Sequence, residues 1–317
     1  MRKNSFPFLA AVGIVLALGF LLPWTVRNPF YFFVGYVVLQ YVTIATGWNI
    51  LGGYAGYINF GAAGFFGSGV YLSAFLFTTL GLPLPLCILA AAIFGALLGV
   101  LTGYLTLRIQ GVYFAIATLG LVVVLETIVH NISALGGASG MAVYGPRPPA
   151  WSPGPSQYNF TVMLIIAVAS VALARFVEIS WIGRGLRAVK ASEDAAECSG
   201  VPTLRLKLLA CALSGAVLAA AGAPYPFYTS YVEPVTAFSL IIGLNAIAMP
   251  LIGGTKSWSG PVLGALLLAS VQQIATVTIS SELNILFVGL VLIAFVAFAP
   301  GGLADLFGRK SSGGAKP

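Results

Sequence analysis

Apolar stretches of about 20 residues recur along almost the whole chain, and no other feature restricts the fold as strongly. A helix of that length crosses the hydrocarbon core of a bilayer and satisfies its own backbone hydrogen bonds there. Glycine, proline and polar residues divide the sequence into about ten such segments: 6–26, 30–50, 58–80, 85–107, 111–130, 159–178, 207–228, 237–254, 258–280 and 283–304. The sequence therefore predicts an all-α, polytopic integral membrane protein with about ten transmembrane helices.

The scarcity of charge excludes a soluble fold. Only 7% of the residues are charged and 59% are hydrophobic, whereas about 25% of the residues in soluble domains are charged. The longest loop between the predicted spans has fewer than about 30 residues, and independent domains begin near about 50. We expect one transmembrane domain over residues 1–317, with residues 311–317 forming a disordered cytoplasmic tail.

The basic residues predict how the spans are oriented. The chain has 15 Lys and Arg against 8 Asp and Glu, and basic residues gather in the cytoplasmic loops of membrane proteins. With alternating spans and both termini in the cytoplasm, Arg27 and Arg147 lie outside and every other Lys and Arg lies inside. The charge therefore indicates membrane orientation rather than nucleic-acid binding. The tryptophans, Trp48 among them, mostly fall at span ends, as in an aromatic belt.

The inner loop over residues 181–206 holds the densest charge in the chain. Leu186, Val189, Glu193 and Ala196 share one face at helical spacing, and Gly200 suits the position after a helix end. Two interpretations remain open from these residues alone. The loop is either a solvated helix that satisfies the positive-inside rule, or a helix on which a cytoplasmic partner docks.

The same loop resembles the EAA-type coupling loop of ATP-binding-cassette (ABC) importer permeases, and more specifically the LivM-type permeases of branched-chain amino acid transporters. The similarity starts with residues 185–189, of sequence GLRAV, and continues through Glu193, residues 195–197 and Gly200 to residues 207–210, of sequence KLLA. Further segments resemble that family in the same order: 49–71, 107–119, 136–141 and 253–265.

The resemblance implies a complete set of partners and a transport function. It implies a second related permease, two cytoplasmic ATP-binding subunits, an extracytoplasmic solute-binding protein and a bacterial cytoplasmic membrane. The implied activity is movement of leucine, isoleucine and valine by alternating access, with ATP hydrolysed by the partners and no cofactor in this chain. The residues that it assigns to ATPase coupling are Gly185, Arg187, Glu193, Ala195, Ala196 and Gly200.

Two groups of glycines suggest further roles. The early cluster is flanked by two asparagines, and its glycines either pack helices closely or break a helix where a substrate passes. The candidate residues of the translocation path are Asn49, Gly52, Gly53, Gly56, Asn59, Gly61, Tyr113 and Thr118. The second group, Gly95, Gly99 and Gly103, repeats every four residues and predicts a contact between two helices.

The residues needed for catalysis or metal binding are missing. The chain has a single histidine, His130, and three cysteines without metal-ligand spacing. Residues 253–257, of sequence GGTKS, lack the glycine that precedes the lysine of a phosphate loop. We therefore expect a transport subunit that is not an enzyme and holds no metal.

Two other transport functions stay open. Uptake of urea or short-chain amides by a sister system is the nearest alternative. A stand-alone secondary transporter is the alternative from another class, and it requires paired charges inside the membrane. Glu126 is the one candidate for such a charge.

Overall fold

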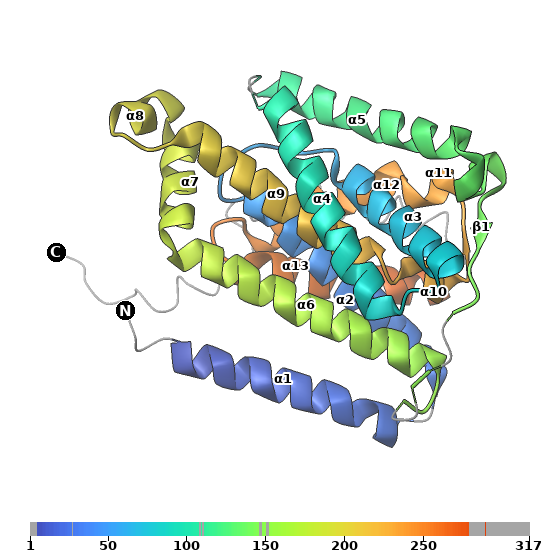
Figure 1. Cartoon of the computed structure of the whole chain (residues 1–317). Helices are drawn as coiled ribbons and strands as arrows, with labels where there is room; N and C mark the ends of the chain where they lie inside the picture. The colour runs from blue at the N-terminus through green and yellow to red at the C-terminus, as the bar shows by residue number, and fades with distance from the viewer. Residues whose placement is uncertain are drawn as a thin grey trace.

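The computed structural model describes residues 5–26, 28–107, 109, 111–145, 148–149, 152–278 and 289, and in this part the chain is a bundle of long helices (Figure 1). The long helices are α1 (Ser5–Thr25), α2 (Pro29–Leu51), α3 (Ala62–Leu80), α4 (Leu84–Thr106), α5 (Val112–Asn131), α6 (Pro155–Ile179), α9 (Thr203–Gly222), α12 (Leu240–Gly253) and α13 (Ser259–Thr278). The shorter elements are η1 (Ser133–Leu135), η2 (Gly137–Ser139), β1 (Met141–Ala142), α7 (Trp181–Ala191), α8 (Glu193–Cys198), α10 (Tyr225–Thr229), β2 (Tyr231–Val232) and α11 (Pro234–Ala237).

The helices confirm the membrane-spanning fold. Within the described residues, 8 helices are long and apolar enough to cross a bilayer, and α1 adds the shorter apolar stretch Ala10–Thr25. The predicted span 283–304 and the predicted tail 311–317 lie outside the described residues. The same holds for Arg27, Arg108 and Arg147.

For three predicted spans, the difference between the predicted and the observed bounds has a local reason. The span predicted from residue 58 begins at Ala62, because residues 52–61 form an irregular loop. The span 207–228 is divided between α9 and α10, which meet near Pro224. The span 237–254 begins near Ser239, whose Oγ accepts a hydrogen bond from the Ile241 amide at 3.3 Å and caps α12.

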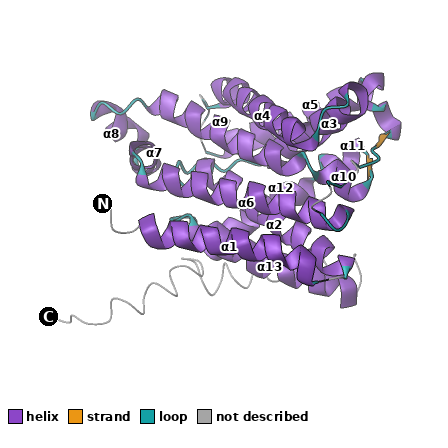
Figure 2. Cartoon of the chain, turned by 60° about the horizontal axis from the view of Figure 1, so that its bottom comes forward, coloured by secondary structure: helices purple, strands orange, loops and turns teal. Residues whose placement is uncertain are grey.

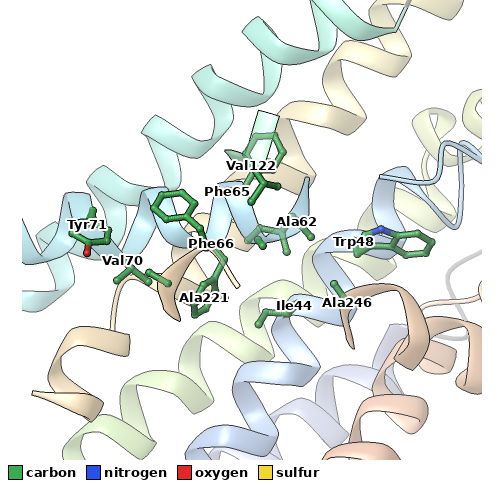
Figure 3. Close-up of a cluster of buried hydrophobic side chains, with 14 of the residues drawn as sticks. Ile44, Trp48, Ala62, Phe65, Phe66, Val70, Tyr71, Val122, Ala221 and Ala246 are labelled. Carbon is green, nitrogen blue, oxygen red and sulfur yellow. The ribbon is translucent and has the colours of Figure 1, made fainter. Parts of the chain in front are cut away.

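The core lies where α2, α3 and α9 pack together. Phe65 and Phe66 of α3 are almost fully buried there, beside residues from α2 and α9 (Figure 3). Trp48 is only 2% exposed, and its Nε1 donates to the carbonyl of Asn59 at 2.7 Å. The prediction that Trp48 belongs to an interfacial aromatic belt is therefore wrong, because its indole N–H is hydrogen-bonded inside the protein.

The two ends of the bundle differ. One end carries α7 and α8, and the other carries η1, η2, α10, α11 and the strands (Figures 1 and 2). There β1 pairs antiparallel with β2, with Met141 opposite Val232. This short ladder was not predicted, because two residues are too few to show an alternating pattern.

Gly136, Gly137 and Gly140 all have positive φ angles, which explains the glycine-rich sequence before β1.

Candidate functional site

The charged inner loop folds as two helices at one end of the bundle, α7 and α8, which we call, together with the two residues that follow them, the coupling segment (residues 181–200). The helix expected across this loop is interrupted at Ser192, whose backbone is extended. The Ser192 Oγ accepts a hydrogen bond from the Ala195 amide at 3.3 Å, so Ser192 caps the start of α8. Acidic residues in the first turn of α8 also favour a helix start.

One face of the coupling segment packs on the bundle despite this interruption. Leu186, Val189 and Ala196 are at most 5% exposed. Gly185 also belongs to this face, because a Cβ there would lie 2.5 Å from the Leu206 side chain of α9. The segment is therefore held firmly against α9.

The opposite face of the coupling segment is open. Arg187, Ala195 and Gly200 are exposed, as are the charged residues Asp194 and Glu197. This face therefore presents charged and small side chains to the surroundings.

The segment ends at Gly200, which has a φ angle of +80°. The Gly200 amide donates to the Glu197 carbonyl at 2.9 Å, and the Val201 amide donates to the Ala196 carbonyl at 3.0 Å. This pair of hydrogen bonds is a Schellman cap, in which glycine takes the left-handed position without strain.

Glu193 points toward the bundle and forms an ion pair with Lys207 of α9. The other carboxylate oxygen, Oε2, accepts a hydrogen bond from the Tyr57 hydroxyl at 2.7 Å. The Lys207 ammonium also donates to the Tyr57 hydroxyl at 3.2 Å and to the Leu107 carbonyl at 3.4 Å. Burial and the adjacent Glu193 raise the pKa of Tyr57, so its hydroxyl keeps its proton and remains a donor.

Two more contacts fix the irregular loop of residues 52–61. The Lys190 ammonium of α7 donates to the Gly53 carbonyl at 2.8 Å. Near it, the Tyr54 hydroxyl donates to Glu178 at 3.3 Å, and the same carboxylate oxygen accepts the Trp258 amide at 2.6 Å. The loop between α2 and α3 is therefore bound directly to the coupling segment and to the end of α6.

The predicted path residues gather around this loop, with one exception. Asn49, Asn59 and Thr118 are at most 4% exposed, and the Phe60 amide donates to the Thr118 hydroxyl at 3.1 Å. Tyr113 is 73% exposed on α5, so its side chain does not join the others.

The asparagine and glycine residues among the predicted path residues determine the local backbone conformation of the loop. Asn59 Oδ1 accepts a hydrogen bond from the Gly61 amide at 2.7 Å, just before α3 begins. Gly56 has a φ angle of +81°, and a Cβ there would lie 2.9 Å from Lys190 Cγ. Gly52 follows directly after α2, and Gly53 provides the carbonyl that Lys190 binds. The cluster therefore shapes a break between two spans, beside the coupling segment.

The second group of glycines lies where α4 meets α9. A Cβ at Gly99 would lie 2.5 Å from the Cys211 carbonyl oxygen, and one at Gly103 would lie 3.2 Å from Cys211 Cβ. Gly95 faces the Gly215 carbonyl just as closely. At Gly95 and Gly99 the two backbones approach too closely for any side chain, whereas at Gly103 the space is limited by neighbouring side chains.

Sequence reasoning missed Tyr57, Lys190 and Lys207. Each lies in a segment that the sequence analysis had singled out. A local pattern does not show, however, that their side chains point into the bundle or which residues they bind there. One signal was present: Lys207 lies inside an apolar segment, and a cation in that setting requires an acidic or carbonyl partner.

Glu126, the candidate for ion coupling, has no charged partner in the part of the chain that is described. It is half-buried on α5. No group of three or more His, Cys, Asp or Glu side chains suited to a metal occurs there either.

A bundle of membrane-length helices, with a helical segment bound at one end to a break between two spans, defines a multi-pass membrane protein. Residues 30–296 match the family described as the permease component of the branched-chain amino acid transport system, and the chain belongs to that family. It is accordingly a multi-pass protein of the inner membrane.

Individual relatives agree with the family match. The chain is 26% identical over 295 residues to the high-affinity branched-chain amino acid transport system permease protein LivM of Escherichia coli (strain K12), covering 85% of this chain and 69% of that protein. It is 24% identical over 265 residues to the corresponding permease protein LivH of the same strain, covering 76% of this chain and 83% of LivH. The resemblance to LivM-type permeases is thus confirmed. No solved structure matches the chain.

Proposed function

We propose that this chain is one of two permease subunits in an ABC importer that carries leucine, isoleucine and valine into the cell. The family match over residues 30–296 carries the proposal, because it covers the spans from α2 to α13 and the coupling segment. The names of the relatives LivM and LivH support the substrate class and a second, related permease.

The open face of the coupling segment supports docking of a cytoplasmic ATPase. Arg187 and Ala195 lie on this face, and the chain itself lacks a phosphate loop. In this mechanism the ATPases bind and hydrolyse ATP, and their closure displaces α7 and α8 relative to the spans. The displacement switches the access of the path from one side of the membrane to the other.

The surroundings of the loop suit a small zwitterion. Asn49 offers a buried, neutral polar group, and the Thr46 hydroxyl has no hydrogen-bond partner among the described residues. An apolar side chain of the substrate gains from leaving water, and its charged ends are stabilised by helix-end dipoles and amides rather than by ions.

The proposed orientation places the coupling segment and both termini in the cytoplasm. The basic residues of α7 support this, because Arg184, Arg187 and Lys190 lie together at that end. A solute-binding protein then docks at the opposite end, where β1 and β2 lie.

Substrate competition in proteoliposomes tests the proposal. The chain is reconstituted with its second permease, both ATPases and the binding protein, and uptake of radiolabelled leucine is measured with ATP inside. We expect unlabelled isoleucine and valine to suppress leucine uptake, and urea or acetamide at the same concentration to leave it unchanged. Uptake of labelled urea in place of leucine would overturn the substrate assignment.

A further inference from the structure

A buried ionic network joins the coupling segment to the irregular loop. The Lys207 side chain is 4% exposed and that of Glu193 is 19% exposed. Charges removed from water are costly unless they are paired and fully hydrogen-bonded. Here the Lys207 ammonium has three acceptors: Glu193, the Tyr57 hydroxyl and the Leu107 carbonyl.

The network directs Glu193 away from the open face. Both of its carboxylate oxygens are engaged inside the protein, Oε1 by Lys207 and Oε2 by Tyr57. The carboxylate is therefore occupied by this chain and is not presented to a docked protein. The surface offered to a partner consists of other residues of the coupling segment, such as Arg187, Asp194 and Ala195.

Tyr57 extends the connection to the membrane spans. Its ring packs edge-on against Phe114 of α5, with 5.2 Å between ring centroids. Four residues further along the loop, Gly61 lies directly before α3. The Tyr57 hydroxyl thus connects α8 with residues at the starts of α3 and α5.

We propose that Glu193, Lys207 and Tyr57 form the linkage by which movement of the coupling segment repositions residues 52–61 at the end of the translocation path. This inference rests on the proposed function, and it assigns Glu193 a positioning role within the permease. Lys190, bound to the Gly53 carbonyl, is a second and independent connection to the same loop.

The test compares uptake with ATP hydrolysis in the complete reconstituted complex. Tyr57→Phe removes only the hydroxyl and keeps the ring against Phe114, while Glu193→Gln keeps the shape and removes the charge. For both variants we expect leucine transported per ATP hydrolysed to fall by about fivefold or more, the size of a typical coupling between sites. Hydrolysis stimulated by the loaded binding protein should stay within about twofold of the unmodified complex, since the open face is unchanged.

Tyr31→Phe is the matched control. It removes the same atom from a tyrosine that is 64% exposed near the start of α2, and it should leave the ratio of uptake to hydrolysis unaltered. A parallel fall of uptake and hydrolysis in Tyr57→Phe, at an unchanged ratio, would indicate a merely structural role and overturn the linkage. An unchanged ratio with full activity would overturn it as well.

A double variant gives a second readout. If the three residues act as one unit, Glu193→Gln combined with Lys207→Met should lower the ratio no further than the worse single variant. Additive losses would contradict a shared linkage. Failure of the unmodified complex to take up leucine would instead refute the proposed function, so the two failures are distinguishable.

Discussion

Lys207 places a positive charge in the second turn of α9, with almost no contact with solvent. The cost of that burial is offset because the ammonium meets a carboxylate, a hydroxyl and a carbonyl. Local sequence patterns cannot predict this arrangement, because Tyr57 and Lys207 are 150 positions apart in the chain. The types of residue were visible in the sequence, and the fold alone brings them together.

Replacing Lys207 should therefore reduce stability. Lys207→Met leaves the Glu193 carboxylate without its counter-ion, and we expect the free energy of unfolding to fall by about 2 kcal/mol. That figure is below the range for fully buried pairs, because Glu193 is partly exposed. Unfolding by denaturant of the detergent-solubilised protein measures the change.

The double variant Glu193→Gln with Lys207→Met provides the control. It leaves no unpaired charge, so part of the lost stability should return. If the double variant is less stable than Lys207→Met alone, the ion pair does not explain the loss.

Helices and loops were predictable to different degrees. Apolar runs located the described spans, because a bilayer requires each crossing helix to be long and apolar. The glycine repeat in α4 also fits its place against α9, since close packing needs small residues at that spacing. By contrast, the start of α8 at Ser192 depends on a single cap, and the break at residues 52–61 depends on contacts with distant helices.

The close contact between α4 and α9 predicts that a larger side chain at Gly99 destabilises the protein. Gly99→Val would push a side chain against the Cys211 carbonyl, 2.5 Å from the position of Cβ. We expect a loss of about 1 to 3 kcal/mol, as for overpacking of a close interface. The melting temperature in detergent should fall accordingly.

Gly120→Val on α5 is the matched substitution, because a Cβ at Gly120 meets nothing within 4 Å. It should change the melting temperature much less than Gly99→Val does. Equal effects of the two substitutions would mean that helix propensity, rather than the contact with α9, determines the loss.

In the whole molecule, two regions that the sequence analysis treated as separate candidate sites lie next to each other. The coupling segment and the loop of residues 52–61 are in direct contact at one end of the bundle. Tyr113, also predicted to line the path, is exposed on α5 and lies apart from this contact. The coupling segment is therefore joined both to α9 and to the break between α2 and α3.

ATP-dependent uptake of labelled leucine, measured as the complex is assembled stepwise in proteoliposomes, tests the central claim most directly. We predict no uptake by this chain alone or with its second permease, even under an imposed proton or sodium gradient. Uptake should appear when the ATPases, ATP and the loaded binding protein are present together. Gradient-driven uptake by the isolated chain would contradict the account.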